Sequence, residues 1–496
     1  MANRSAVHDL QTLVLSYHSL IVIETVEEER VRSILQEVAR NLALPLYDWS
    51  ITSGLTRSLG VTIEGTTDPT LLLHKIRDIH DNDAIYLLKD FAPHLTQPNI
   101  CRAFRELVTR MNATRSALVI TGDPVELPRD LEALAVRFEM QMPQPDEVRE
   151  MVRSVVDAMS ARQRIRVDLS KEDAQKLVRA LSGLTLSQVR QAIARVIVSD
   201  NSLTGDDVEE VIRWKGEIIE RGGLLEFYPA EANKFELGGF ARLKAWLENA
   251  AVGFTSEARA MNLQPPKGVL FVGVQGCGKS LAAKFIARQW RMPLLKLDAG
   301  RLYDKYVGES EKNFRKATNL AEAMAPVILW IDEIEKGFAQ GGSNDADGGL
   351  SQRLFASVLT WLQEKRQEVF VVGAANDLEK LPPELLRKGR FDEIFFVDLP
   401  TPDERKTIFS IHLGLRKQDP KKFDLDALSA ATGGFSGAEI EQCVISALYR
   451  SLRTREPLTT EAIVQSVRAT VPLSVSRRED IDALRESAQG RFTPVA

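Results

Sequence analysis

The sequence predicts an α/β fold that is built twice, each time as a parallel sheet covered by helices and followed by a helical lid. Three observations predict it. Short apolar runs alternate with helical patterns, a glycine-rich phosphate-binding motif joins one apolar run to a helix, and residue pairs recur at a nearly constant offset. The expected parts are a first α/β domain, its lid, a linker, a second α/β domain, its lid and a tail, at residues 1–142, 143–215, 216–235, 236–400, 401–473 and 474–496.

The bulk composition argues against several classes of protein. The 496 residues carry 64 basic and 69 acidic side chains, and the net charge of −5 gives no sign of a nucleic-acid-binding surface. No apolar run reaches the roughly 18 residues of a membrane span, and the first residues lack the apolar core of a signal peptide, so a cytoplasmic location is expected. Cys101, Cys277 and Cys443 lie too far apart for a disulfide framework or a metal cluster. Oxidation of Cys277, which lies in the glycine-rich motif, could block phosphate binding; alternatively, it is a small residue that fills the loop.

The first half alternates strand and helix patterns. Strands are expected at 20–23, 46–49, 84–88 and 117–121, and helices between them at 27–42, 70–79 and 100–111. This alternation is typical of a parallel sheet with helices on its faces. From Pro143 to about residue 215 helical patterns continue without a strong strand signal, which predicts a helical lid.

The second half contains the motif G-x-x-x-x-G-K-[ST] at Gly273–Ser280, between an apolar run at 269–272 and a helical pattern at 281–288. In such a loop the glycines let backbone N–H groups surround phosphates, Lys279 reaches the outer phosphates and the Ser280 hydroxyl binds Mg²⁺. The helix that follows presents its N-terminus, which favours anions. A surface glycine turn is the alternative, and the flanking strand and helix argue against it.

Two acids and an asparagine complete a site for phosphoryl chemistry. The buried-type strand expected at 327–331 ends in Asp332 and Glu333. Asp332 would hold Mg²⁺, and Glu333 would polarise the attacking water. The next strand, expected at 369–373, leads to Asn376, which could orient that water; a turn-forming asparagine is the alternative. These residues predict hydrolysis of a nucleoside triphosphate.

Matching residues recur between the two halves. Ala39-Arg40 and Pro45-Leu46 match Ala287-Arg288 and Pro293-Leu294 at one offset of 248 residues. Three further pairs keep the same order: Leu127-Pro128 with Leu381-Pro382, Arg137-Phe138 with Arg390-Phe391, and Pro143–Glu147 with Pro400–Glu404. Because order and spacing are kept, an internal duplication is favoured over chance similarity.

The same offset shows what the first copy lacks. The second copy has Gly273, Gly276, Gly278, Lys279 and Ser280 where the first has Thr25, Glu28, Arg30, Val31 and Arg32. The missing glycines remove the backbone freedom that a phosphate loop needs, and the glutamates at 27–29 would repel phosphates. The strand at 84–88 ends in Lys89-Asp90 rather than in two acids. The first copy is therefore predicted to keep the fold without binding ATP through this loop.

Five motifs together resemble the AAA subgroup of the AAA+ ATPases: Leu237-Gly238-Gly239, Gly273–Ser280, Ile328–Glu333, the segment from Val369 through Arg390-Phe391-Asp392, and Gly434–Ala438. The match covers about residues 235 to 470. More loosely, the whole chain resembles an uncharacterised AAA family encoded in cyanobacteria and some plastids. The resemblance implies a P-loop NTPase fold with a three-layer α/β domain and a lid, ATP and Mg²⁺ as cofactors, and a stromal location if the gene is carried by a plastid.

The resemblance also assigns roles to single residues. Ser280 and Asp332 would hold Mg²⁺. Glu333 would be the catalytic glutamate and Asn376 the first sensor. The nucleotide contacts would be Leu237, Gly238, Gly273, Gln275, Gly276, Cys277, Gly278, Lys279, Ser280 and Leu281.

Two arginines point to a ring. Arg387 and Arg390 resemble arginine fingers, which reach the γ-phosphate of a neighbouring subunit and so require a closed oligomer, six-membered in the family. Surface ion pairing is the alternative. Two positions depart from the wider pattern: Ala375 replaces the threonine that usually precedes the sensor, and Ala438 leaves no second-sensor arginine, as is usual in this subgroup.

One segment bears on the substrate. Lys305-Tyr306-Val307-Gly308 resembles the first pore loop of AAA translocases, in which an aromatic residue grips extended polypeptide. Tyr306 would grip the client, or alternatively would pack beneath its own loop. The glycine-rich and acidic stretch 338–349 would form a second loop near the channel, or a solvated linker.

These expectations favour a homo-oligomeric ATPase ring that remodels or threads a protein partner, with the first copy as a structural or adaptor tier. The expected partner is a protein client, and no membrane partner is expected. Two alternatives are an ATP-dependent switch that controls assembly with a partner, and a nucleic-acid motor. The net charge, the aromatic pore loop and the lack of an appended DNA-binding motif disfavour the motor.

Overall fold

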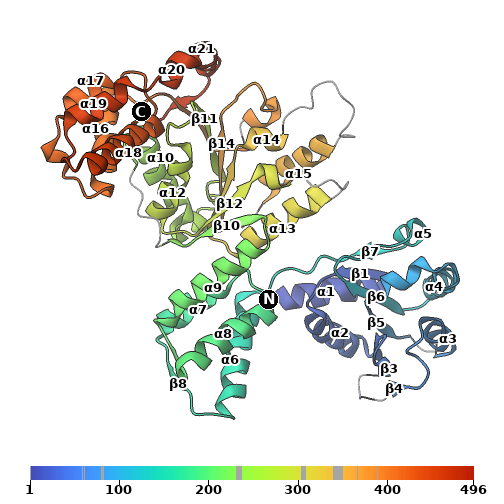
Figure 1. Ribbon diagram of the computed structural model, residues 1–496. Coiled ribbons are helices and arrows are strands. Elements are labelled where there is room, and N and C mark those ends of the chain that lie inside the picture. Colours follow the sequence, from blue (N-terminus) through green and yellow to red (C-terminus); the bar gives the residue numbers. More distant parts are fainter. Residues whose placement is uncertain are drawn as a thin grey trace. The chain divides into compact units, whose positions relative to one another are not determined.

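The chain forms two compact units, Met1–Val211 and Ile212–Ala496. In the computed structural model the described residues are 2–57, 60, 62–79, 83–230, 237–302, 309–338, 350–365, 367–387 and 389–496 (Figure 1). Each unit contains one seven-stranded sheet and one group of lid helices.

The first unit is built on a largely parallel sheet of order β4-β3-β2-β5-β6-β1-β7. The five strands from β2 to β7 in this order are parallel, and β3 and β4 add an antiparallel edge that the sequence patterns did not predict. The bounds are β1 (Leu20–Glu24), β2 (Leu46–Ser50), β3 (Gly54–Arg57), β4 (Thr62–Ile63), β5 (Ile85–Lys89), β6 (Ala117–Gly122) and β7 (Val136–Arg137).

Helices cover both faces of this sheet because successive strand side chains point to opposite sides. Ile21 and Ile23 of β1 enter a core with α1 and α2, whereas Leu20 and Val22 enter a core with α3 and α4. The expected three-layer arrangement is confirmed. The helices are α1 (Ala2–Leu15), α2 (Glu28–Leu42), α3 (Pro69–Ile79), α4 (Pro98–Met111) and the short α5 (Arg129–Glu132).

The first lid follows as helices α6 (Pro145–Ser160), α7 (Lys171–Leu181), α8 (Leu186–Asp200) and the start of α9 (Asp207–Arg221), a helix that belongs to the second unit from Ile212 onward. Thr185 begins α8 with a capping box, in which its hydroxyl accepts from the Gln188 N–H and the Gln188 side chain accepts in return. Two three-residue strands, β8 (Arg166–Asp168) and β9 (Ser202–Thr204), pair in parallel within this lid. They are too short to give a strand signal in the sequence.

The second unit repeats the arrangement. Its sheet has the order β10-β12-β13-β14-β11-β15-β16, and the parallel strands β12-β13-β14-β11-β15 correspond in order to β2-β5-β6-β1-β7 of the first unit. This shared topology supports the internal duplication. The bounds are β10 (Leu225–Tyr228), β11 (Gly268–Gly273), β12 (Leu294–Asp298), β13 (Val327–Asp332), β14 (Val369–Ala375), β15 (Glu393–Val397) and β16 (Thr493–Pro494).

Helices again pack on both faces of the second sheet. Val269 and Phe271 of β11 enter a core with α10 and α12, and Leu270 and Val272 enter a core with α13 and α15. The helices are α10 (Ala241–Ala251), α11 (Ser256–Ala260), α12 (Lys279–Trp290), α13 (Glu309–Ala323), α14 (Ile334–Phe338) and α15 (Leu350–Glu364).

The second lid has its own apolar core, which includes Phe409, Leu428, Ile440 and Ile463. Its helices are α16 (Pro402–Leu415), α17 (Leu425–Ala431), α18 (Gly437–Thr454) and α19 (Thr460–Arg468). The short 3₁₀ turns along the chain are η1 (Ala92–Thr96), η3 (Val252–Phe254), η4 (Ala299–Leu302), η6 (Pro383–Leu386) and η7 (Pro420–Lys422).

Two stretches differ from the sequence-based expectation. Residues 216–228, within the expected linker 216–235, form the end of α9 and the strand β10, which pairs antiparallel with β12. The expected tail 474–496 forms α20 (Leu473–Ser476), α21 (Arg478–Ala488) and β16, which pairs with β15. Both strands are short edge strands with few buried side chains, so hydrophobic periodicity does not reveal them.

One of the matched residue pairs is also corrected. Ile21 pairs with Val136 in the first sheet, and the equivalent Val269 pairs with Glu393 in the second. Arg137 therefore corresponds to Ile394, the residue after Glu393, and not to Arg390. A local match of Arg-Phe dipeptides gave the wrong register because such short pairs recur by chance.

Candidate functional site

The phosphate loop is formed by the five residues between the end of β11 at Gly273 and the start of α12 at Lys279. Gly273 approaches its neighbour strand so closely that a Cβ there would lie 2.0 Å from the carbonyl oxygen of Val397. Gly278 has a φ of 96°, a conformation that side chains disfavour. The loop geometry thus requires glycine at these two motif positions.

The Lys279 side chain is buried against the backbone of its own phosphate loop. Its side chain is 6% exposed, and its Nζ donates to the carbonyl oxygens of Gly273 at 2.7 Å and Val274 at 2.9 Å. Burial lowers the pKa of Lys279 to about 8. An ammonium held in this way can exchange carbonyl oxygens for phosphate oxygens without moving far.

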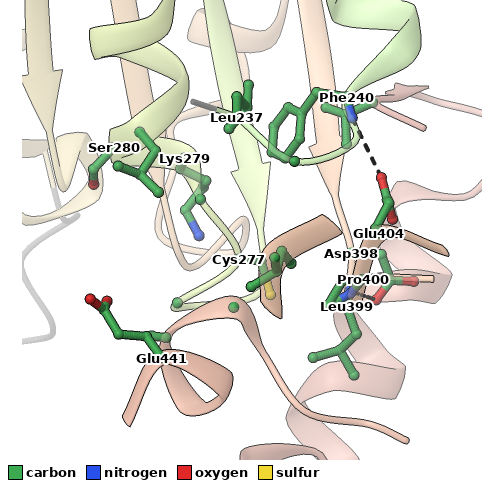
Figure 2. Close-up of a pocket in the computed structure, with 18 of the residues that line it drawn as sticks. Leu237, Phe240, Cys277, Lys279, Ser280, Asp398, Leu399, Pro400, Glu404 and Glu441 are labelled. Atoms are coloured by element: carbon green, nitrogen blue, oxygen red, sulfur yellow. Dashed lines mark hydrogen bonds between the residues drawn. The ribbon is translucent and has the colours of Figure 1, made fainter. Parts of the chain in front are cut away.

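A cavity of about 930 Å³ opens beside the loop. Its walls come from the α/β domain and from the lid, which contributes Ile408, His412 and Ala438. Figure 2 shows Leu237, Cys277, Lys279 and Ser280 around it. Nine of the ten expected nucleotide contacts line this cavity, and the tenth, Gly273, offers its carbonyl to Lys279. The cavity also contains the expected acids and the sensor, Asp332, Glu333 and Asn376.

The donor set at the phosphate end fits Mg²⁺. The Ser280 hydroxyl and the Asp332 carboxylate, both hard oxygen donors, line the same cavity. Within the described ranges no group of three or more His, Cys, Asp or Glu side chains could hold a metal ion. One carboxylate, a hydroxyl, substrate phosphates and water is the usual Mg²⁺ environment in such sites. Burial raises the pKa of Asp332, which a bound cation would oppose.

Glu333 follows β13 with a φ of 47°, in the left-handed region. Its backbone N–H donates to Asp332 Oδ1 at 3.2 Å, and its Oε2 accepts from Lys336 Nζ at 2.6 Å. Lys336 is largely exposed, so this ion pair contributes little to stability. Glu333 can therefore exchange the lysine for a water molecule.

Glu335 is a site residue that the sequence reasoning missed. Its side chain is 5% exposed, and its Oε1 accepts from the backbone N–H of Asn376 at 3.0 Å. Among the described residues its Oε2 has no hydrogen-bond partner, and burial raises its pKa. Glu335 thus fixes the end of β14 where Asn376 emerges. The signal was the third acid of Asp332-Glu333-Ile334-Glu335.

Arg390 lies away from the phosphate loop of its own chain. The segment that carries it is attached to the amino end of β11, where the Lys267 N–H donates to Asp392 Oδ2 at 2.6 Å and Lys267 Nζ donates to the Gly389 carbonyl oxygen at 3.2 Å. The phosphate loop follows the carboxyl end of the same strand, roughly 16 Å away at 3.3 Å per residue. Arg387, in the same segment, is exposed.

The expected pore loop Lys305-Tyr306-Val307-Gly308 lies outside the described residues, as does 339–349 of the expected second loop. Cys277, in contrast, lies within the described residues. It is buried, and burial raises the pKa of its thiol to about 12. A thiol that rarely ionises reacts slowly with oxidants, which favours the reading of Cys277 as a small residue that fills the loop.

In the first unit a helical turn replaces the phosphate loop. The strands β1 and β2 keep the offset of 248 from β11 and β12, but α2 begins at Glu28, the equivalent of Gly276, whereas α12 begins three residues later at Lys279. Only Thr25, Val26 and Glu27 separate β1 from α2. The first turn of α2 therefore occupies the place of the cradle.

A buried ion network lies at the start of α2 in this unit. Arg30 is 8% exposed and donates to both carboxylate oxygens of Glu147, each at 3.1 Å, and to Glu27 Oε2 at 3.3 Å. The Glu27 Oε1 accepts from the Leu186 N–H of the lid at 2.6 Å. These bonds join the start of α2 to α6 and α8, so the lid is connected to the sheet by protein groups alone.

Comparison with known proteins bears on this geometry. The model of the ATPase family associated with various cellular activities (AAA) matches residues 269–399, and the AAA+ lid domain matches 422–465. The SpoVK-like AAA ATPase N-terminal and second domains match 6–140 and 146–222. The "Uncharacterized AAA domain-containing protein ycf46" of Pyropia yezoensis is 34% identical over 480 residues, which cover 96% of each chain.

This chain belongs to the AAA ATPase family. Proteins of the same printed name from Trieres chinensis and Guillardia theta are also 34% identical, over 94% and 98% of this chain and 93% and 95% of their own. The resemblance stated from the motifs is confirmed, and ATP with Mg²⁺ is the cofactor pair of the AAA site. In the part of the chain that the structure describes, no helix is both long and apolar enough to cross a bilayer.

Proposed function

We propose that this AAA protein hydrolyses ATP in a six-membered ring and uses the energy to remodel or thread a protein partner. The observation that carries the proposal is the shared cavity, which Lys279, Asp332 and Glu333 line together. The first unit serves as a structural or adaptor tier, since a helical turn and a buried ion network fill its former loop.

The residues of this chain divide the chemistry among them. Lys279 leaves the loop carbonyls and neutralises the outer phosphates. Ser280 and Asp332 would hold Mg²⁺, which would supply further positive charge at the phosphates. Glu333 gives up Lys336 and accepts a hydrogen bond from the attacking water. Asn376, held by Glu335, orients that water. The lid residues close over the cavity and exclude bulk solvent.

The placement of the arginines supports a ring. Because the segment of Arg387 to Asp392 is attached near the amino end of β11, Arg390 serves a phosphate group on another chain rather than on its own. A head-to-tail contact that repeats in this way closes into a ring. A cytoplasmic location, or a stromal one in a plastid, agrees with this proposal.

The protein client rests on the resemblance of Lys305–Gly308 to a pore loop. A regulatory assembly switch is the second candidate, and it differs in one respect: ATP turnover would then not depend on Tyr306. A nucleic-acid motor is less supported, because the net charge is −5 and the chain lacks a basic excess.

Glu333→Gln provides the test. The variant should bind ATP and lose turnover by at least about a hundredfold, the usual contribution of a general base. Affinity purification of this variant in ATP should then retain a protein client, and the same variant carrying Tyr306→Ala should not retain it. Turnover equal to that of the unmodified chain would remove Glu333 from its role, and captured nucleic acid without protein would favour the motor.

A further inference from the structure

A strand formed by the last few residues of the sequence lies against the nucleotide cavity. β16 pairs in parallel with β15, at Phe395 with Thr493 and Phe396 with Pro494. The residues that follow it, Val495 and Ala496, line the cavity together with Pro494. We call Thr493–Ala496 the strap. Its Val495 side chain is 5% exposed and belongs to the same apolar core as Leu237 and Phe240.

The strap caps α10. The first N–H groups of a helix have no partner within the helix, and Phe240, the residue that precedes α10, has no side-chain acceptor to supply one. The Val495 carbonyl oxygen accepts from the Arg242 N–H at 3.1 Å instead, while the Val495 N–H donates to the Phe396 carbonyl oxygen at 3.2 Å. Val495 thereby joins the start of α10 to the sheet.

This cap fixes the segment Leu237–Phe240, which lines the cavity. Phe240 has a φ of 60°, a left-handed conformation that persists only where several contacts hold it. Its N–H donates to Glu404 Oε1 at 3.4 Å, the dashed bond in Figure 2. On the other side Lys244 of α10 donates from Nζ to the Leu237 carbonyl oxygen at 2.9 Å. The position of α10 therefore sets the positions of both ends of the segment.

Phe240 and Leu237 in turn reach the phosphate loop. A Cβ on Gly278 would lie 3.5 Å from the Phe240 ring and 3.8 Å from Leu237 Cδ1. A second connection reinforces the strap. Arg485 of α21, just before it, makes a two-pronged ion pair with Asp398, another cavity residue, at 2.9 Å from Nε to Oδ2 and 2.8 Å from Nη2 to Oδ1.

We propose that the strap is a positioning element for the base end of the bound nucleotide, with Val495 as its central residue. It holds α10 and the Leu237–Phe240 segment in the geometry that receives the purine. The phosphate end depends on it less, because the bonds of Lys279 lie within its own loop. The proposal rests on ATP binding at this site and is independent of the remodelling role.

The test compares a ligand that has a base with one that lacks it. Val495→Asp and the milder Val495→Ala are made in the full chain, and affinities for Mg²⁺-ATP and for Mg²⁺-tripolyphosphate are measured by calorimetry. Val495→Asp should weaken ATP binding on the order of tenfold, as when a preorganised contact segment loosens, and Val495→Ala should weaken it less. Tripolyphosphate affinity should fall much less than ATP affinity in both variants.

Val475→Asp is the matched control, since Val475 precedes the strap on α20 and is largely exposed; it should change neither affinity. Unchanged ATP affinity in both Val495 variants would overturn the proposal. Equal weakening of ATP and tripolyphosphate would also overturn it, because a purely structural role affects both ligands. If Val495→Asp does not fold, the loss of ATP affinity relative to the loss of tripolyphosphate affinity in Val495→Ala decides. An unmodified chain that binds no ATP would instead contradict the proposed function.

Discussion

Lys89 occupies in the first sheet the strand position that Asp332 occupies in the second. Both end the strand next to β2 or β12, and the residues that follow them, Asp90 and Glu333, share a left-handed backbone with φ of 51° and 47°. The neighbouring strand carries the opposite charge in each unit. In the first unit Asp48 accepts from Lys89 Nζ at 3.2 Å. The equivalent residue of the second unit is Lys296, whose positive charge favours the charged form of Asp332. An ammonium thus takes the place of the metal anchor.

This exchange predicts a double-mutant cycle. The Lys89 and Asp48 side chains are each 14% exposed. Lys89→Asp places an acid beside Asp48 and should lower the free energy of unfolding by about 1–3 kcal/mol. Adding Asp48→Lys should recover part of that loss, because opposite charges face each other again, although Arg32, 3.2 Å from Asp48, keeps the recovery incomplete. Urea unfolding of the four proteins measures the coupling. Additive losses would show that the two side chains do not interact.

The ion network of the first lid predicts a sharp difference between two arginines. Arg30→Ala leaves Glu27 and Glu147 buried without their cation and should cost about 3–5 kcal/mol in unfolding free energy. Arg102→Ala removes an exposed pair with Glu106 and should cost less than about 1 kcal/mol. Chemical denaturation gives both values, and one ATP per chain should still bind in each variant. Similar costs for the two would contradict the network.

Burial of Lys279 predicts that ATP binding is linked to protons. Because burial lowers the pKa of the free site to about 8, the ammonium is lost as the pH rises through 8, and ATP affinity should fall. Bound phosphates restore the charge, so binding at pH 8.5 should take up roughly 0.7 proton. Calorimetry in two buffers of different ionisation enthalpy measures this uptake. Cys277→Ser should retain it, and its absence in the unmodified chain would contradict the assignment to Lys279.

Glu335 is expected to act through Asn376. Glu335→Ala removes the acceptor of the Asn376 N–H and loosens the sensor, so kcat should fall about tenfold while KM for ATP changes little. Glu335→Gln keeps an acceptor oxygen and should restore most of the rate. Steady-state kinetics of both variants distinguish positioning from simple destabilisation, which the conservative change would not reverse.

The arginine segment predicts complementation between subunits. Arg387→Ala and Glu333→Gln should each be nearly inactive alone, since every active site in each ring lacks one part. Mixed rings contain some interfaces with an intact Glu333 on one chain and an intact Arg387 on its neighbour, so ATP turnover should reappear when the two proteins are mixed. No recovery after subunit exchange would weigh against action between chains.

The α/β alternation, the phosphate loop and the acids could be predicted from the sequence, because these features depend on local patterns. Apolar runs such as 327–331 become buried strands, and Gly273 and Gly278 adopt backbone conformations that other residues disfavour. The loss of the loop in the first copy was also predicted from single residues, because an offset of 248 aligns Gly278 with Arg30.

Features that depend on contacts between residues far apart in the sequence could be identified only from the three-dimensional fold. In the sequence Arg30 is only the residue that replaces a glycine of the phosphate loop, whereas in the fold it pairs with Glu147, 117 positions away. The Glu335 side chain accepts a hydrogen bond from the Asn376 N–H, 41 positions away. Val495 caps a helix that begins more than 250 residues earlier. Such pairings leave no periodic signal in a single chain, since two-residue strands and long-range hydrogen bonds are fixed by packing of the whole unit. The residues that carry the chemistry of the site form short motifs in the sequence, whereas the residues that hold them in position come from distant parts of the chain.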